Sequence, residues 1–167
     1  MRRAMGSFAS GVTVITGMEG ESPVGFACQS FASVSLDPPL VLFCADHRGQ
    51  AWPRMRGTGR FTVNVLAEGQ RELCDRFGSW RGQKFEDLGW DVSRWGTPSL
   101  RGVLVRVHCE VHEVHEGGDH DVVLGRVLEL ENVSGDLPMI FFRGQFGLDS
   151  HVVVNAPDLW GWGDRWG

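Results

Sequence analysis

Residues 23–44 read PVGFACQSFASVSLDPPLVLFC. Two apolar stretches flank a cluster of small and hydroxyl-bearing residues, and an Asp37-Pro38-Pro39 corner leads into the second apolar stretch. Small side chains at such a bend let a flat ligand lie against exposed backbone N–H and C=O groups. The pattern therefore predicts strands on both sides of a bend, with a ligand site at the bend.

The composition is typical of a single globular domain. At 167 residues the chain can bury roughly two-thirds of its unfolded surface. Its net charge of −5 gives no electrostatic support for general nucleic-acid binding. The apolar runs are far shorter than the roughly 20 residues that span a bilayer, and no apolar segment follows Arg2 and Arg3 as in a signal peptide. We therefore expect a cytoplasmic protein that binds neither membranes nor nucleic acid.

Strand patterns dominate the rest of the chain. Val103 to Val111 alternates apolar and polar residues, and a turn at 116–119 leads to a returning strand over 122–130. About seven strands with few helices predict an all-β fold, an antiparallel barrel. The other expected elements are strands at 11–16, 40–45 (buried on both faces), 60–66 and 139–142 (closing the sheet), a helix over 70–77, a short helix before Gly11 that packs Met5 and Phe8, and another at 52–55.

The chain divides by composition near residue 150. Residues 1–150 are predicted to form the barrel domain, and residues 151–167 a tail rich in Trp and Gly. The tail packs on its own or a partner subunit, or it contacts a separate partner protein; the sequence leaves both interpretations open.

Neither the histidines nor the cysteines indicate a metal site. His108 and His112 share a face of a strand but stand about 13 Å apart, whereas zinc ligands lie about 2 Å from the metal. A solvent-facing strand explains these histidines better. The four cysteines form no CxxC pair, and Cys44 and Cys109 are interpreted as buried small apolar residues.

Several pieces of the chain, in order, resemble the flavin reductase components of two-component flavin-dependent monooxygenases. The resemblance is strongest to reductases of steroid-catabolic hydroxylases and of enediyne biosynthesis. It implies a homodimeric split barrel that binds FAD or FMN and oxidises NADH or NADPH. Because the sequence shows no Arg cluster for the 2′-phosphate of NADPH, NADH is the favoured donor. Reduced flavin would then diffuse to a monooxygenase or halogenase. The matching pieces are residues 5–16, 23–44, 61–66, 84–85, 118–120 and 142–144.

The resemblance places the flavin ring along the first strand and the bend. The residues that would bind the isoalloxazine are Gly25, Ala27, Cys28, Gln29 and Ser30. The backbone of Asn64, Val65 and Leu66 would form another wall, while the Asn64 side chain contacts either the flavin or backbone groups. Lys84 would neutralise a flavin phosphate, and Phe85 would pack on the ribityl or adenine group.

The expected phosphate loop departs from the family pattern. Relatives commonly carry hydroxyl residues where this chain has Gly49 and Ala51. Backbone N–H groups and charged or amide side chains must therefore replace them. The residues expected to bind the cofactor here are Ala45, His47, Arg48, Gln50 and Trp52.

His120 is the expected catalytic-site side chain, because it follows the Gly118-Asp119 turn as the family's histidine does near the nicotinamide. Hydride transfer needs no protein nucleophile, so His120 would position NADH. Arg143 would pair with a nucleotide phosphate or with a carboxylate across the dimer. Without a GxGxxG fingerprint, NADH must bind outside a Rossmann fold.

Two other functions remain open from the sequence. One is a split-barrel enzyme such as a pyridoxamine phosphate oxidase, which would need more basic residues for its substrate's phosphate. The other is a barrel without enzymatic activity that binds an apolar ligand or a protein.

Overall fold

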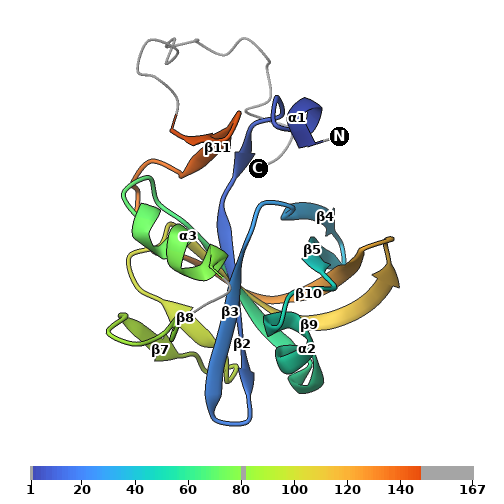
Figure 1. Cartoon of the computed structure of the whole chain (residues 1–167). Helices are drawn as coiled ribbons and strands as arrows, with labels where there is room; N and C mark the ends of the chain where they lie inside the picture. Colours follow the sequence, from blue (N-terminus) through green and yellow to red (C-terminus); the bar gives the residue numbers. More distant parts are fainter. Residues whose placement is uncertain (1, 80–81, 148–167) are drawn as a thin grey trace.

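The computed structural model describes residues 2–79 and 82–147 (Figure 1). The Trp-rich tail at 151–167 lies outside the described residues, so its predicted role stays a prediction. No helix in the described ranges has the length and apolar character needed to cross a membrane. The elements are α1 (Arg2–Met5), β1 (Ser10–Gly11), β2 (Thr13–Glu19), β3 (Ser22–Cys28), β4 (Ala32–Leu36), β5 (Pro39–Asp46), α2 (Ala51–Met55), the 3₁₀ turn η1 (Arg56–Thr58), β6 (Arg60–Val65), α3 (Arg71–Gly78), β7 (Trp90–Val92), β8 (Pro98–Leu100), β9 (Val105–Glu116), β10 (His120–Asn132), β11 (Ile140–Phe142) and β12 (Gln145–Phe146).

Seven strands form one antiparallel sheet in the order β3-β2-β6-β9-β10-β5-β4. The two edge strands, β3 and β4, follow each other in the chain, so the sheet must curl to bring its edges together. At the junction the Ser30 hydroxyl accepts a hydrogen bond from the Cys44 backbone N–H at 2.8 Å. The Ser30 side chain thus bonds to β5 beyond the point where its pairing with β4 ends, and the predicted antiparallel split barrel is confirmed.

Aromatic rings fill the inside of the barrel. The fully buried ring of Phe43 makes edge contacts with Phe26, Trp52 and Phe61, at centroid distances of 5.9, 5.5 and 5.1 Å. Such contacts add stability beyond the area they bury. Strand β5 does not match the prediction of burial on both faces: Val41, Phe43 and Ala45 are buried, while the residues between them are partly exposed.

A second core lies between β3 and helix α3. The predicted spacing of Leu73, Cys74 and Phe77 is confirmed as the inner face of α3. A Cβ on Gly25 would lie 2.9 Å from the Ile15 carbonyl oxygen and 3.0 Å from the Phe77 ring. Glycine at position 25 therefore lets α3 pack directly on the strand.

A buried polar layer covers the outside of the barrel beneath the β7–β8 hairpin. Asn64 donates to the Val14 carbonyl and to the Thr16 hydroxyl, both at 3.0 Å, and accepts from the Leu100 N–H at 2.9 Å. His108 is fully buried and shares a 3.0 Å hydrogen bond with Thr62. The prediction of a solvent-facing His108 is wrong, because a distant segment of the chain covers that face.

The last strands form a separate small sheet. β11 pairs with β1 and β12, so it does not close the seven-stranded sheet as predicted. Arg143 and Gly144 make the tight turn between β11 and β12, with φ values of +49° and +82°. The short helix α1 is present, but Met5 and Phe8 are 57% and 74% exposed, so they do not pack as expected against the part of the chain that the structure describes.

Candidate active site

Two adjoining cavities lie along β3. The first has a volume of about 610 Å³ and is lined by β3, the end of β5, residues 49–54, the end of α3 and residues 82–86. The second, of about 790 Å³, continues past the bend at Gln29 and Ser30 and reaches His120. Phe26 and Ala27 line both, so the strand predicted from the sequence forms their shared wall, and the predicted bend lines the second cavity.

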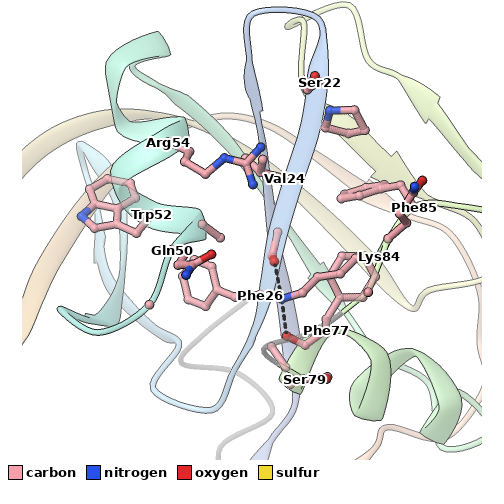
Figure 2. Close-up of a pocket in the computed structure, with 18 of the residues that line it drawn as sticks. Ser22, Val24, Phe26, Gln50, Trp52, Arg54, Phe77, Ser79, Lys84 and Phe85 are labelled. Atoms are coloured by element: carbon pink, nitrogen blue, oxygen red, sulfur yellow. Dashed lines mark hydrogen bonds between the residues drawn. The ribbon is translucent and has the colours of Figure 1, made fainter.

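The free edge of β3 faces the first cavity. Lys84 Nζ donates hydrogen bonds of 3.2 Å to the carbonyl oxygens of Gly25 and Phe77 (Figure 2). The Gly25 carbonyl therefore points away from β2. Because the N–H and C=O of one strand residue share an edge and alternate along the strand, Gly25 and Ala27 both direct their amide groups outward. This edge offers donors and acceptors in a row, as the polar rim of a flat heterocycle requires.

Two cations converge on the same cavity. Arg54 reaches toward β3 from the side opposite Lys84, and its Nε donates to Glu19 at 2.8 Å (Figure 2). Burial lowers the pKa of Lys84, and the nearby Arg54 charge lowers it further. An anionic group bound between the two side chains would relieve both effects.

Two side chains in the loop after β5 already contact carboxylates of the protein itself. Arg48 Nη2 lies 2.6 Å from Asp46 Oδ2, and this pairing lowers the pKa of Asp46 and raises that of Arg48. His47 Nε2 lies 3.0 Å from Asp121. Of the residues expected from this segment, Ala45, Gln50 and Trp52 line the first cavity, whereas His47 and Arg48 line neither cavity.

Five of the predicted residues line the second cavity: Ala27, Cys28, Gln29, Ser30 and His120. Burial raises the pKa of the Cys28 thiol, so this residue acts as an apolar wall. His120 Nδ1 lies 2.7 Å from Asp119 Oδ1, and the side chain is 38% exposed. Its Nε2 has no hydrogen-bond partner among the residues that the structure describes, which leaves it available to a ligand.

Four other predicted residues lie elsewhere. Asn64, Val65, Leu66 and Arg143 line neither of the two cavities. The Asn64 amide bonds to the backbone of Val14 in β2 and of Leu100 in β8, and the predicted flavin wall at 64–66 stays a prediction. The Arg143 guanidinium lies over the Phe142 ring, 5.0 Å from its centroid.

Sequence reasoning missed Arg54, Phe26 and Phe77, which all line the first cavity. Arg54 follows Gln50 by one helical turn, and that spacing was the available signal. Phe77 was predicted only as part of the apolar face of a helix.

A group of His108, Glu129 and Glu131 places its ligand atoms within 4.8 Å of one another. Each carboxylate is already bound by a cation: Arg106 lies 2.9 Å from Glu131, and Arg94 lies 2.8 Å from Glu129. These contacts suit a structural ion-pair cluster better than a metal site.

The comparisons with known proteins agree with this geometry. The flavin reductase like domain matches residues 5–147, and the chain belongs to that family. The chain is similar to the reductase subunit HsaB of a flavin-dependent monooxygenase from Rhodococcus jostii, at 46% identity over 93% of this chain and 80% of that protein.

Two solved structures are also similar. Nitrilotriacetate monooxygenase component B from Mycobacterium thermoresistibile has 44% identity and a TM-score of 0.87, covering 93% of this chain and 89% of the other. The NADH:FAD oxidoreductase SgcE6 of Streptomyces globisporus, solved with NAD and FAD fragments, has 33% identity and a TM-score of 0.85, covering 92% and 93%.

The activity follows from family and fold. The protein is an NADH-dependent flavin reductase of a two-component monooxygenase system, with FAD or FMN as the flavin. The relatives give no support to a pyridoxamine phosphate oxidase or to a barrel without enzymatic activity. The first cavity fits a flavin, because it combines an amide edge, aromatic walls and two cations in a volume typical of ligand pockets.

Proposed function

We propose that the first cavity binds the flavin and that the second admits the nicotinamide of NADH. The amide edge of β3 at Gly25 and Ala27 would hold the polar rim of the isoalloxazine, with the bend at Gln29 and Ser30 beyond it. Lys84 and Arg54 would bind the flavin phosphate. The observation that carries this proposal is the convergence of the two cations on the free edge of β3.

The protein's own contribution to hydride transfer would be positional. Bound flavin accepts a hydride from the nicotinamide, and the chain has to hold the two rings in contact and exclude water. Asp119 would fix the orientation of the His120 ring through Nδ1, so that Nε2 faces the nicotinamide. We place His120 at the nicotinamide because it lines the second cavity beside the residues of the bend.

The phosphate assignment can be tested with Lys84→Met and Arg54→Met. Each variant should weaken FMN binding by about 10-fold or more, because a charge-assisted hydrogen bond contributes about 1.5–3 kcal/mol. Riboflavin, which has no phosphate, should bind with nearly unchanged affinity. Fluorescence titration of both flavins measures the difference.

Arg126→Met is the matched control, since Arg126 of β10 lies 3.9 Å from Glu110 of β9 and lines neither cavity. Equal losses for FMN and riboflavin in the Lys84 and Arg54 variants would argue against phosphate binding by these cations.

We also infer that the protein is a homodimer. Strand β4 is an edge strand, and its Val34 and Leu36 are 47% and 73% exposed. Apolar side chains gathered on a sheet edge are characteristic of a surface that another protein covers. A second copy of this chain is the proposed partner, and the monooxygenase of the system would receive reduced flavin by diffusion.

A further inference from the structure

Asp121 occupies a position where the strand pattern calls for an apolar side chain. In β10 it shares a face with Val123, which is fully buried in the barrel core, and it stands opposite Ala45 of β5. Its side chain is only 17% exposed. A carboxylate held at the mouth of an apolar barrel destabilises the fold unless donors surround it.

All the donors that surround Asp121 come from one segment, residues 47–56. His47 Nε2 lies 3.0 Å from Oδ1, while Trp52 Nε1 lies 2.9 Å and Arg56 Nη1 3.8 Å from Oδ2. The hydrogen bond from Trp52, followed by the one from His47, lowers the pKa of Asp121. The carboxylate is therefore ionised near neutral pH and ties this segment to the barrel.

The segment that Asp121 ties down forms one wall of the flavin cavity. Helix α2 has five residues and no side-chain cap at its N-terminus. A helix so short has little stability of its own. It depends on its attachment to the barrel, where Trp52 is 3% exposed and meets the Phe43 ring. Gln50 and Arg54, on either side of Trp52, line the cavity.

We propose that Asp121 is a positioning residue for flavin binding, which clamps α2 and the preceding loop so that Gln50 and Arg54 face the ligand. The inference rests on the proposed flavin cavity. Strand alternation sends the neighbouring His120 to the opposite face. Loss of the clamp should therefore weaken flavin binding and leave NADH binding unchanged.

The test is a titration of Asp121→Ala and Asp121→Asn with oxidised FMN and with FAD, without NADH, followed by flavin fluorescence. Asp121→Ala removes all three contacts and should weaken binding by about 10-fold or more. Asp121→Asn keeps an acceptor for Trp52 and loses the charge, so a loss of at least about threefold is expected. Asp91→Asn, in the exposed pair with Arg101, is the control and should bind as the unaltered protein does.

Steady-state kinetics separate positioning from general damage. At saturating flavin, kcat and the KM for NADH should stay within about twofold of the unaltered protein. Trp52→Phe keeps an aromatic wall but lacks the Nε1–H donor. Combined with Asp121→Ala, it should cost less than the product of the two single effects.

Two results would overturn the inference. One is a folded Asp121→Asn or Asp121→Ala variant whose flavin affinity is unchanged. Where the alanine variant does not fold, the flavin affinity of Asp121→Asn alone tests the inference. The other is a loss of kcat as large as the loss of flavin affinity. If Lys84→Met weakens FMN binding in the same assay, only the Asp121 inference has failed. If Lys84→Met also has no effect, the proposed cavity has failed as well.

Discussion

At the scale of single residues, the start of strand β10 contributes side chains to two different parts of the candidate site. His120 and Asp121 are neighbours at the start of β10, and the alternation of the strand sends their side chains to opposite sides. Asp121 is bound to α2, and His120 lines the cavity proposed for the nicotinamide. On the proposed assignment, replacements at these two positions should affect flavin binding and NADH binding separately.

Replacement of His120 by alanine should raise the KM for NADH or slow flavin reduction. The lost Nε2 contact would leave the nicotinamide less well oriented, while the residues that bind the flavin stay in place. Anaerobic stopped-flow measurement of flavin reduction, with a parallel FMN titration, checks both halves of the statement. Unchanged reduction kinetics would show that His120 does not position the nicotinamide.

Residues with a local signal could be located from the sequence, whereas those with only long-range partners could not. The small residues at 25–30 were placed by their pattern, and they line the cavities. Arg54 was missed because, in a five-residue helix, its one-turn spacing from Gln50 is the whole of the local signal. The hydrogen bond between Asn64 and the Leu100 backbone was not predictable, because Leu100 lies 36 residues further along the chain.

At the scale of elements, the contact between β3 and α3 sets the shape of the first cavity. Gly25 faces the Phe77 ring, and Phe77 and Gly78 at the end of α3 line the cavity. Because Lys84 bonds to the carbonyls of both Gly25 and Phe77, any shift of α3 also moves the ammonium group. Packing and binding are therefore linked at this point.

Gly25→Ala should lower both stability and flavin affinity. The new methyl group would lie 2.9 Å from the Ile15 backbone oxygen of β2 and 3.0 Å from the Phe77 ring of α3, so these elements have to move apart, at a cost of about 1–3 kcal/mol. Thermal unfolding and FMN titration give the two readouts. Gly11→Ala is the control, because its Cβ would have no neighbour within 4 Å. Equal behaviour of the two variants would contradict the tight contact.

The strands were predictable because alternation and turn residues are local signals, and β6, β9 and β10 lie where the sequence indicated. The burial of His108 was not predictable from β9 itself, since the β7–β8 hairpin covers it. The pairing of β11 was not predictable for the same reason. Its partner β1 lies some 130 residues earlier, and no local pattern specifies that pairing.

At the scale of the whole molecule, ion pairs on the outside of the barrel contribute to its pH stability. Arg106 lowers the pKa of Glu131 below its ordinary value of 4.5, and His108 contributes further. A lowered carboxyl pKa stabilises the fold fully above pH 4.5, and this contribution is lost as the pH falls through the folded pKa.

Glu131→Gln should therefore reduce the free energy of unfolding at neutral pH by about 1 kcal/mol, a value discounted for the partial exposure of the pair. The difference from the unaltered protein should shrink as the pH falls below 4.5. Urea denaturation across this range measures it. A difference that stays constant with pH would show that the ionised pair is not responsible.

Replacement of Leu36 by aspartate should convert the proposed homodimer to a monomer. The residue is 73% exposed on β4, and a charge there would have to be desolvated in an interface. Light scattering coupled to size-exclusion chromatography reports the mass. Glu21→Gln, at the exposed β2–β3 turn, serves as the control.

An open strand edge that receives a flat ligand is equally able to receive another polypeptide. The outward amides of β3 would pair with any extended chain that reached them, and such pairing is a common route to aggregation. The ammonium of Lys84 lies across this edge at the Gly25 carbonyl and obstructs such a strand. Removing that cation should make the ligand-free protein precipitate more readily, and added flavin should protect it.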